Sequence, residues 1–306
     1  MFNSTQHPAN LPNQPEIAAA IALLEAHPDY RVLRTLPPAE TLVSQLPPVL
    51  PLHVAAIVDV ETTGLCAGLD EVLELAVQRL RFDALGRIVE VGTARSWLQE
   101  PVDPLTPEIT AITGLTDEML AGQRIDTSAA TSLIGSADVV IAHNAAFDRP
   151  FVDLLLPAVK DAAWACTMCE IDWRAHGFEG RALNHLVYQA GTSGYFFGGH
   201  RAATDVLALL NLLAHPIGDD GATILGKLVA TSETPSIKVM AVGAAFDRKD
   251  ALKRRGYRWD ANRQHWWTTV SAADEARERA FLTECIYRPG QEPQVEPVTW
   301  HDRYRG

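Results

Sequence analysis

Hydrophobic residues in this chain fall into short runs and alternating stretches, a pattern typical of strands separated by helices. Residues 54–58 are an unbroken apolar run, which predicts a strand buried on both faces. Residues 71–82 and 88–98 alternate between apolar and polar positions and predict antiparallel partners of that strand. A second apolar run, 138–142, follows a helical stretch and is expected to lie parallel to the first. The pattern therefore predicts an α/β fold, a mixed sheet flanked by helices.

Acidic side chains follow both apolar runs. Asp59 and Glu61 end the first run and lie two positions apart, so on a strand they point to the same side and can share one cation. The alternative is a strand end with two solvated acids. The second run leads into a helix whose first turn carries Asp148, where a plain interaction with the helix dipole is the alternative.

A fourth acid stands in the stretch GGHRAATDVLALLNLL, residues 198–213, which predicts a helix after two glycines. His200 and Asp205 are five positions apart, about 140° in azimuth on a helix, so a rigid helix does not superimpose them. We expect Asp205 to point inward from the helix and His200 to approach from the glycine-rich segment. A solvated histidine and a surface aspartate are the alternative.

Composition divides the chain into two globular parts with connecting segments. With 306 residues and 47% hydrophobic content, the chain is long enough for one large core and a smaller module. Prolines and polar residues mark the segments between them. The expected parts are an N-terminal arm with a helix and strand extension (1–51, flexible over 1–14), the main domain (52–215), a linker (216–236), a small α+β module (237–290) and a disordered tail (291–306).

Charge and cysteine content restrict the function. A net charge of -12 argues against broad coating of nucleic acid, and clustered acids would repel phosphate until divalent cations filled the site. Four scattered cysteines do not make a disulfide scaffold, and buried thiols are favoured over zinc for the pair Cys166 and Cys169. The N-terminus lacks the pattern of a signal peptide, and no apolar run is long enough to span a membrane. A cytoplasmic protein with no membrane partner is expected.

The C-terminal module has the opposite charge balance. Residues 236–290 contain eleven Lys and Arg against seven Asp and Glu, a balance of +4. The segment FDRKDALKRRGYRWDANRQHWW resembles a small module attached to some nucleic-acid enzymes. Trp259 and one of the two tryptophans at 266 and 267 are expected in its core, while arginines beside aromatic rings are typical of single-strand binding. The candidate accessory nucleic-acid contacts are Arg254, Arg255, Arg258 and Arg263.

Four motifs occur in one order: D-x-E-T-T-G after a buried strand, T-G-L-T-D-E-M, H-N-x-x-F-D and H-x4-D. Together they resemble the DnaQ-like 3′-to-5′ exonucleases of the DEDD superfamily, DEDDh subgroup, over about residues 52–213. The resemblance implies a ribonuclease H-like fold and makes 52–215 an exonuclease domain. It implies that four acids bind metal, namely Asp59, Glu61, Asp148 and Asp205. It also implies that His200 is the catalytic histidine of the DEDDh subgroup. It also implies a terminal-nucleotide pocket that includes Thr62, Thr63, Gly64, Leu65, Thr113, Gly114 and Asn144, although a plain turn is an alternative for Thr113.

Phosphodiester hydrolysis agrees with these residue types. Two Mg²⁺ or Mn²⁺ ions about 3.5–4 Å apart can supply a hydroxide nucleophile and compensate phosphate charge, and carboxylates are the oxygen ligands they prefer. Asp59 is the best candidate to bridge both ions. His200, with a reference pKa of about 6.5, is the side chain suited to accept the proton of water near neutral pH.

The sequence thus predicts a metal-dependent 3′-to-5′ exonuclease acting on nucleic acid with a free 3′ end. DNA, single-stranded or with frayed or repair ends, is favoured over RNA. The alternatives are an RNA-trimming exoribonuclease, a polymerase proofreading subunit and a catalytically dead nucleic-acid-binding protein. A homodimer and a DNA-polymerase or repair partner both stay open. The catalytic domain is expected to fold without residues 236–306.

Overall fold

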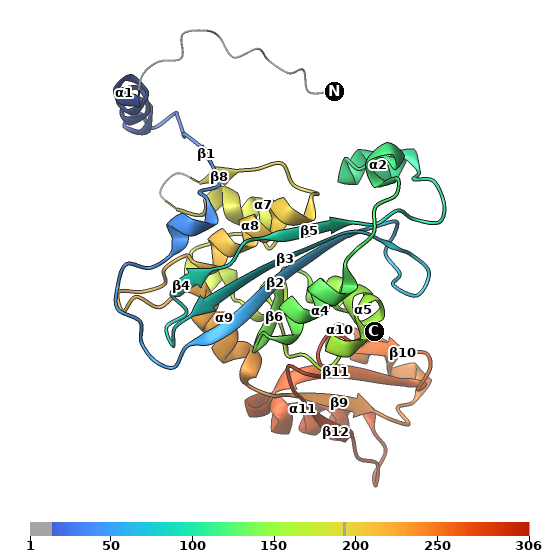
Figure 1. The fold of residues 1–306 in the computed structure, drawn as a ribbon. Helices are drawn as coiled ribbons and strands as arrows, with labels where there is room; N and C mark the ends of the chain where they lie inside the picture. Colours follow the sequence, from blue (N-terminus) through green and yellow to red (C-terminus); the bar gives the residue numbers. More distant parts are fainter. Residues whose placement is uncertain (1–13, 192–193, 306) are drawn as a thin grey trace.

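A six-stranded mixed sheet is the largest element of the computed structural model, which describes residues 14–191 and 194–305 (Figure 1). Its strand order is β4-β3-β2-β6-β7, and β5 also pairs with β3. The strand β2 is antiparallel to β3 and parallel to β6, as predicted. This is the ribonuclease H-like architecture that the motifs implied. The strands are β2 (His53–Thr62), β3 (Val72–Phe82), β4 (Ile88–Val91), β5 (Arg95–Leu98), β6 (Val139–Ala142) and β7 (Trp164–Cys166).

Helices cover both faces of the sheet, because β2 is apolar at successive positions that point to opposite sides. Ala55 and Ile57 pack with α7, α8 and α9, while Ala56 and Val58 pack on the side of α4 and α5. The helices are α2 (Pro107–Thr113), α3 (Asp117–Leu120), α4 (Thr127–Gly135), α5 (Ala145–Leu155), η2 (Pro157–Val159), α6 (Thr167–Glu170), η3 (Trp173–His176), α7 (Leu183–Gln189), α8 (Ala202–Leu213) and α9 (Ile224–Glu233).

The N-terminal extension is small. The predicted arm, residues 1–14, lies outside the described residues except for its last position, where α1 (Gln14–Glu25) begins. After it come β1 (Arg34–Thr35) and η1 (Ala39–Leu42), and β1 pairs in parallel with β8 (Tyr195–Phe196). Within the described ranges, no helix is both long and apolar enough to cross a membrane.

The C-terminal module is a four-stranded sheet, β10-β11-β9-β12, with helices packed on it. Its core includes Leu252, Tyr257 and Leu282. The prediction that Trp259 lies in this core is wrong, since 50% of its surface is exposed, and the neighbouring Tyr257 is buried instead. The elements are β9 (Ser236–Ala241), η4 (Phe246–Arg248), α10 (Lys249–Arg254), β10 (Arg258–Asp260), β11 (His265–Ser271), η5 (Ala272–Asp274), α11 (Glu275–Phe281), η6 (Leu282–Ile286, a π-helix) and β12 (Gln294–Val298).

Two expected connections are structured. The predicted linker, 216–236, contains α9, which packs against β7 and α8. The predicted disordered tail, 291–306, contains β12, which pairs with β9, and continues back to the larger domain, where the Trp164 amide donates to the Trp300 carbonyl at 2.9 Å. Its proline and charge content indicated disorder, but a sheet edge tolerates Pro297 and the ordering contacts are distant in sequence. Both predictions are therefore wrong over these elements.

Candidate active site

Three of the four predicted acids meet on one face of the sheet. Asp59 and Glu61 follow Ile57 at alternate positions of β2, so they point toward α8, and Asp205 lies in the first turn of that helix. Ligand oxygens of these three carboxylates lie within 4.8 Å of one another. A single cation placed between them can contact all three.

Asp148 approaches from the other face of the sheet. It lies in the first turn of α5 and is 2% exposed, and its Oδ1 accepts a hydrogen bond from the Val60 amide at 3.3 Å. It is not one of the three acids that share a common ligand position. Its charge nevertheless raises the pKa of Asp59, second only to burial, so Asp148 borders the cluster from behind β2.

Burial raises the pKa values of all four acids, and repulsion among the acids raises those of Asp59 and Glu61 further. Burial followed by the charges of Asp148 and Asp205 raises the pKa of Asp59 well above its ordinary value. Burial and the charge of Asp205 raise the pKa of Glu61 to about 8, and burial raises the pKa of Asp148 to about 7. Burial also raises the pKa of Asp205. Because crowded carboxylates ionise together only beside positive charge, these residues fit a divalent cation.

His200 lies just before α8, outside the helix, and its side chain is exposed. Its backbone φ is 65°, in the left-handed region that non-glycine residues seldom adopt. The following amide, that of Arg201, donates to Asp205 Oδ2 at 3.2 Å, and the charge of His200 acts on Asp205. The histidine and the helix acid are thus neighbours even though their spacing is wrong for one face of a helix.

Glu74 belongs to the site but was missed from the sequence. It pairs with Glu61 across β2 and β3, is fully buried, and raises the pKa values of Asp59 and Glu61. Its Oε2 accepts from Arg201 Nε at 3.0 Å and from the Ala202 amide at 3.3 Å. Glu74 therefore anchors the start of α8. The available signal was a glutamate within residues 72–77, which are otherwise apolar.

Hydroxyl groups predicted to line the nucleotide pocket bond within the protein. Thr62 Oγ1 donates to the Gly64 carbonyl at 2.6 Å, and Thr63 Oγ1 accepts from the Glu71 amide. A side chain at Gly64 would collide with the Asp70 carboxylate. These residues shape the turn after β2.

The other predicted pocket residues differ in exposure. Leu65 is 88% exposed and Asn144, at the start of α5, is exposed. Thr113 is buried, and its hydroxyl bonds to the Ile109 carbonyl and the Leu115 amide. Gly114 ends α2 with φ 68°. Leu65 and Asn144 are therefore accessible to a ligand, whereas the Thr113 hydroxyl stabilises the end of α2.

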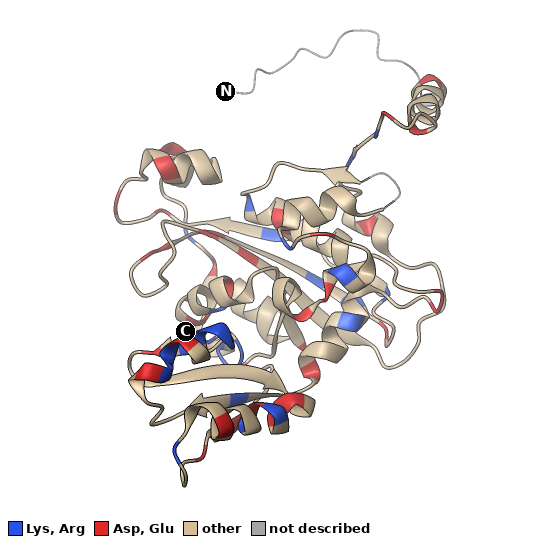
Figure 2. Cartoon of the chain, turned by 180° about the vertical axis from the view of Figure 1, so that it is seen from behind, with Lys and Arg blue, Asp and Glu red and all other residues tan. Residues whose placement is uncertain are grey.

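The predicted accessory arginines are not equivalent. Lys and Arg residues gather in the C-terminal module, including helix α10 (Figure 2). Arg254 and Arg263 are exposed, and the Arg258 guanidinium lies 5.8 Å from the Trp267 ring. Arg255 instead forms an ion pair with Glu278 at 3.1 Å and lies over Phe281. Arg255 thus has a structural role within the module.

The fold is ribonuclease H-like, and the acid cluster is a site that could hold a metal ion. A family model described as "Exonuclease" (RNase T) matches residues 56–213, just over half of the chain, and the chain belongs to this exonuclease family. The resemblance to DnaQ-like DEDD exonucleases is thereby confirmed.

Curated relatives match about a third of the chain. DNA polymerase III of the PolC type from Halalkalibacterium halodurans is 37% identical over 100 residues, covering 32% of this chain and 6% of that protein. The PolC-type polymerase of Thermotoga maritima is 30% identical over 110 residues, covering 35% of this chain and 8% of that protein. The chain thus spans only a small fraction of the length of these relatives.

Similar solved structures are exonucleases. Exonuclease X, in complex with 5′ overhanging duplex DNA, is 26% identical with a TM-score of 0.40, and the match covers 52% of this chain and 89% of that one. E. coli exonuclease I, in complex with a dA16 oligonucleotide, is 16% identical with a TM-score of 0.46, and the match covers 82% of this chain and 64% of that one.

Proposed function

We propose that the protein removes nucleotides from the 3′ end of DNA by metal-dependent hydrolysis. The observation that carries this proposal is the convergence of Asp59, Glu61 and Asp205 beside Asp148, at the end of the central strand of an exonuclease-family domain. Clustered carboxylates with raised pKa values in a site are typical of cation-binding or acid-base chemistry. A cytoplasmic location stays a prediction.

Asp59, Glu61, Asp148 and Asp205 are the proposed ligands of two Mg²⁺ or Mn²⁺ ions. Carboxylate oxygens are the donors that these ions prefer. When bound, the ions would supply a water of lowered pKa and compensate the charge of the phosphate. Bound cations would also allow all four acids to ionise. Asp148, held by the Val60 amide, is the ligand farthest from the group of three.

His200 is the proposed general base. Its exposed imidazole stands near Asp205 and can accept a proton from an attacking water and return it to solvent. The Glu74–Arg201 ion pair fixes the segment that carries His200. Asp205 therefore serves the site in two ways, as a ligand and as the acceptor for the Arg201 amide.

The substrate proposal uses the exposed groups around the cluster. Leu65 is proposed to pack against the terminal base and Asn144 to bind its nucleotide. Thr62, Thr63, Gly64 and Gly114 are proposed to shape this pocket through their backbone. Arg254, Arg258 and Arg263 in the C-terminal module are proposed to contact phosphates farther along the strand, which compensates for the acidic balance of the remaining chain.

Oligonucleotides labelled at one end test this proposal. Matched DNA and RNA strands carrying a 5′ label are incubated with the protein in Mg²⁺, Mn²⁺ or EDTA. We expect a ladder of shortened 5′-labelled DNA in either metal, slower shortening of RNA, and no cleavage in EDTA. Release of the 5′ label as a mononucleotide, before shortened labelled strands appear, would contradict the direction, and unchanged cleavage in EDTA would contradict metal dependence.

Proofreading is a second candidate, favoured by the likeness of about 100 residues to PolC-type DNA polymerases. A mismatched 3′ terminus unpairs easily and would enter a single-strand site sooner than a paired one. A proofreading exonuclease should therefore shorten a mismatched primer end faster than a matched end on the same template. Equal rates on the two ends would leave general 3′ trimming as the function.

A further inference from the structure

The last residues of the chain return to the nuclease domain and bind an arginine next to the site. Arg149 follows Asp148 on α5 and is fully buried. Its Nη1 donates to the Arg303 carbonyl at 2.6 Å, and its Nη2 donates to the carbonyls of His301, at 2.7 Å, and Lys160, at 2.9 Å. A buried guanidinium needs acceptors for all its donors. The C-terminal segment thus supplies acceptors that α5 requires.

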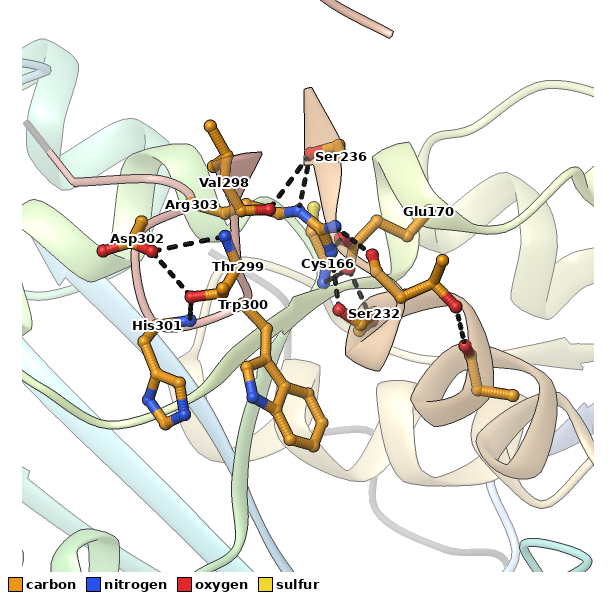
Figure 3. Close-up of polar contacts among 12 residues, drawn as sticks. Cys166, Glu170, Ser232, Ser236, Val298, Thr299, Trp300, His301, Asp302 and Arg303 are labelled. Carbon is orange, nitrogen blue, oxygen red and sulfur yellow. Dashed lines mark hydrogen bonds and ion pairs between the residues drawn. The ribbon is translucent and has the colours of Figure 1, made fainter. Parts of the chain in front are cut away.

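Arg303 joins several elements from the same segment. Its Nη1 donates to Glu170 Oε1 of α6 and to the Ser232 carbonyl of α9, both at 2.7 Å (Figure 3). Its Nη2 donates to the Thr234 carbonyl, and its Nε to Ser236 Oγ at 3.4 Å. Residues 234–236 carry the chain into the C-terminal module. One side chain therefore ties the entry of the module to two helices of the nuclease domain.

The backbone of the segment also bonds to β7, the strand at the edge of the large sheet. The Trp164 amide in β7 donates to the Trp300 carbonyl at 2.9 Å, and Tyr304 packs against the core on the side of α5. Immediately before the segment, β12 pairs with β9 of the module. Residues 299–305 thus link β12 directly to the face of the nuclease domain that carries Asp148.

We propose that residues 299–305 form a clasp that positions α5, and with it Asp148, behind the acid cluster. Arg149 is held by the clasp on one side, while the adjacent Asp148 accepts from the Val60 amide on the other. Releasing the clasp removes the carbonyl acceptors of Trp300, His301 and Arg303 from a buried charge at this turn of α5, which favours local opening of the turn. The role of Asp148 as a metal ligand rests on the proposed function, whereas the anchoring of α5 does not.

Two arginines of the clasp provide a matched test in the full chain. Arg303→Ala removes the central side chain. Arg305→Ala removes a more peripheral one, which pairs with Asp161 at 2.9 Å and donates from Nε to the His301 carbonyl at 3.0 Å. Hydrogen exchange of the amides of residues 145–151 is measured without metal, and Mn²⁺ affinity is measured by titration. We expect Arg303→Ala to speed exchange about tenfold or more and to weaken Mn²⁺ binding about tenfold, and Arg305→Ala to have a smaller effect on both.

If Arg303→Ala folds and its hydrogen exchange and Mn²⁺ affinity are both unchanged, the proposed clasp is overturned. If Arg303→Ala does not fold, Arg303→Lys, which keeps the charge but not the planar fork, is judged by the same two measurements. Added synthetic peptide TWHDRYRG, residues 299–306, should partly restore slow exchange to Arg303→Ala, and the same peptide with alanine at the Arg303 position should not. If the unmodified protein neither binds Mn²⁺ nor cleaves DNA, the proposed function fails, while the exchange comparison still decides the clasp.

Discussion

Carboxylates of the nuclease domain are crowded and buried, whereas the proposed nucleic-acid contacts of the C-terminal module are exposed. In the domain, burial and neighbouring charge raise the pKa values of Asp59 and Glu61, so their full charge depends on a cation. In the module, Arg254 and Arg263 are exposed and Arg258 lies over an aromatic ring. The two regions offer phosphate different interactions, one dependent on divalent metal and the other on salt concentration.

The largest expected effect is a loss of cleavage in the nuclease domain without a loss of strand binding by the module. Asp59→Asn removes a charge that all other acids of the cluster face, so turnover should fall to background while binding of long single strands through the module persists. Cleavage rate and strand affinity are measured on the same preparation in saturating Mg²⁺. Asp103→Asn, a change at an exposed acid, is the control. Normal turnover by Asp59→Asn would exclude the proposed metal site.

His200→Ala sharpens the description of the acidic site itself. It removes a proton acceptor and no proposed metal ligand, so kcat should fall about 10²- to 10⁴-fold. Mn²⁺ affinity and KM should change little. A loss of substrate affinity as large as the loss of turnover would make His200 a binding residue instead of a base.

Glu74→Gln tests the support of that base. Glutamine keeps the size of the side chain but removes the charge that pairs with Arg201. We expect turnover to fall about 10- to 100-fold, the range seen when groups that orient metal ligands are changed. Because Glu74 is proposed to act through the His200 segment, the pH profile of kcat should shift as well. An unchanged profile with normal turnover would assign Glu74 a purely structural role.

The module arginines should have a smaller, salt-dependent effect. Alanine at Arg254, Arg258 or Arg263 should reduce the slope of log affinity against log salt for a single strand by about 0.7 for each lost phosphate contact. Arg255→Ala is the matched control, because its ion pair with Glu278 predicts lower stability and an unchanged slope. If all four variants keep the slope of the unmodified protein, the module does not bind phosphate through these arginines.

The smallest effect concerns the stability of the metal-free protein. Acids whose pKa values are raised on folding stabilise the folded state below their unfolded pKa values, about 4. This contribution is lost as pH rises through about 7 for Asp148 and about 8 for Glu61. The free energy of unfolding in EDTA should therefore fall by about 1 kcal/mol or more between pH 5 and 8. Thermal unfolding of Asp59→Asn should show a flatter pH dependence, and Mg²⁺ should reduce the loss.

Deleting the C-terminal module would also remove contacts that the nuclease domain uses. The sequence predicted that the catalytic domain would stay folded after deletion of residues 236–306, because the positive charge balance lies in this module while the metal site needs only the last one or two nucleotides. The structure has the buried Arg149 guanidinium bonded to carbonyls of the deleted residues. Point variants of the module are therefore better tests of its role than truncation.

Local sequence patterns were enough to predict most strands and site residues of the nuclease domain. The apolar runs predicted β2 and β6, and the alternation of side chains along a strand predicted that Asp59 and Glu61 point to one side. The order of motifs then indicated the family, and the glycines before α8 predicted that His200 stands outside the helix. Each of these inferences uses residues within a few positions of one another.

Only the tertiary structure identified Glu74, the clasp and the exposed position of Trp259. Glu74 contacts Arg201 across 127 positions, and Arg149 reaches the Arg303 carbonyl across 154. The Arg303 side chain reaches Glu170 across 133. Periodicity and composition describe only neighbouring residues, and a charged side chain has the same sequence signal whether it is solvated or buried against a distant partner. The sequence by itself therefore determined the strands and the acids at their ends, while the partners of the buried charges were decided by the packing of distant segments.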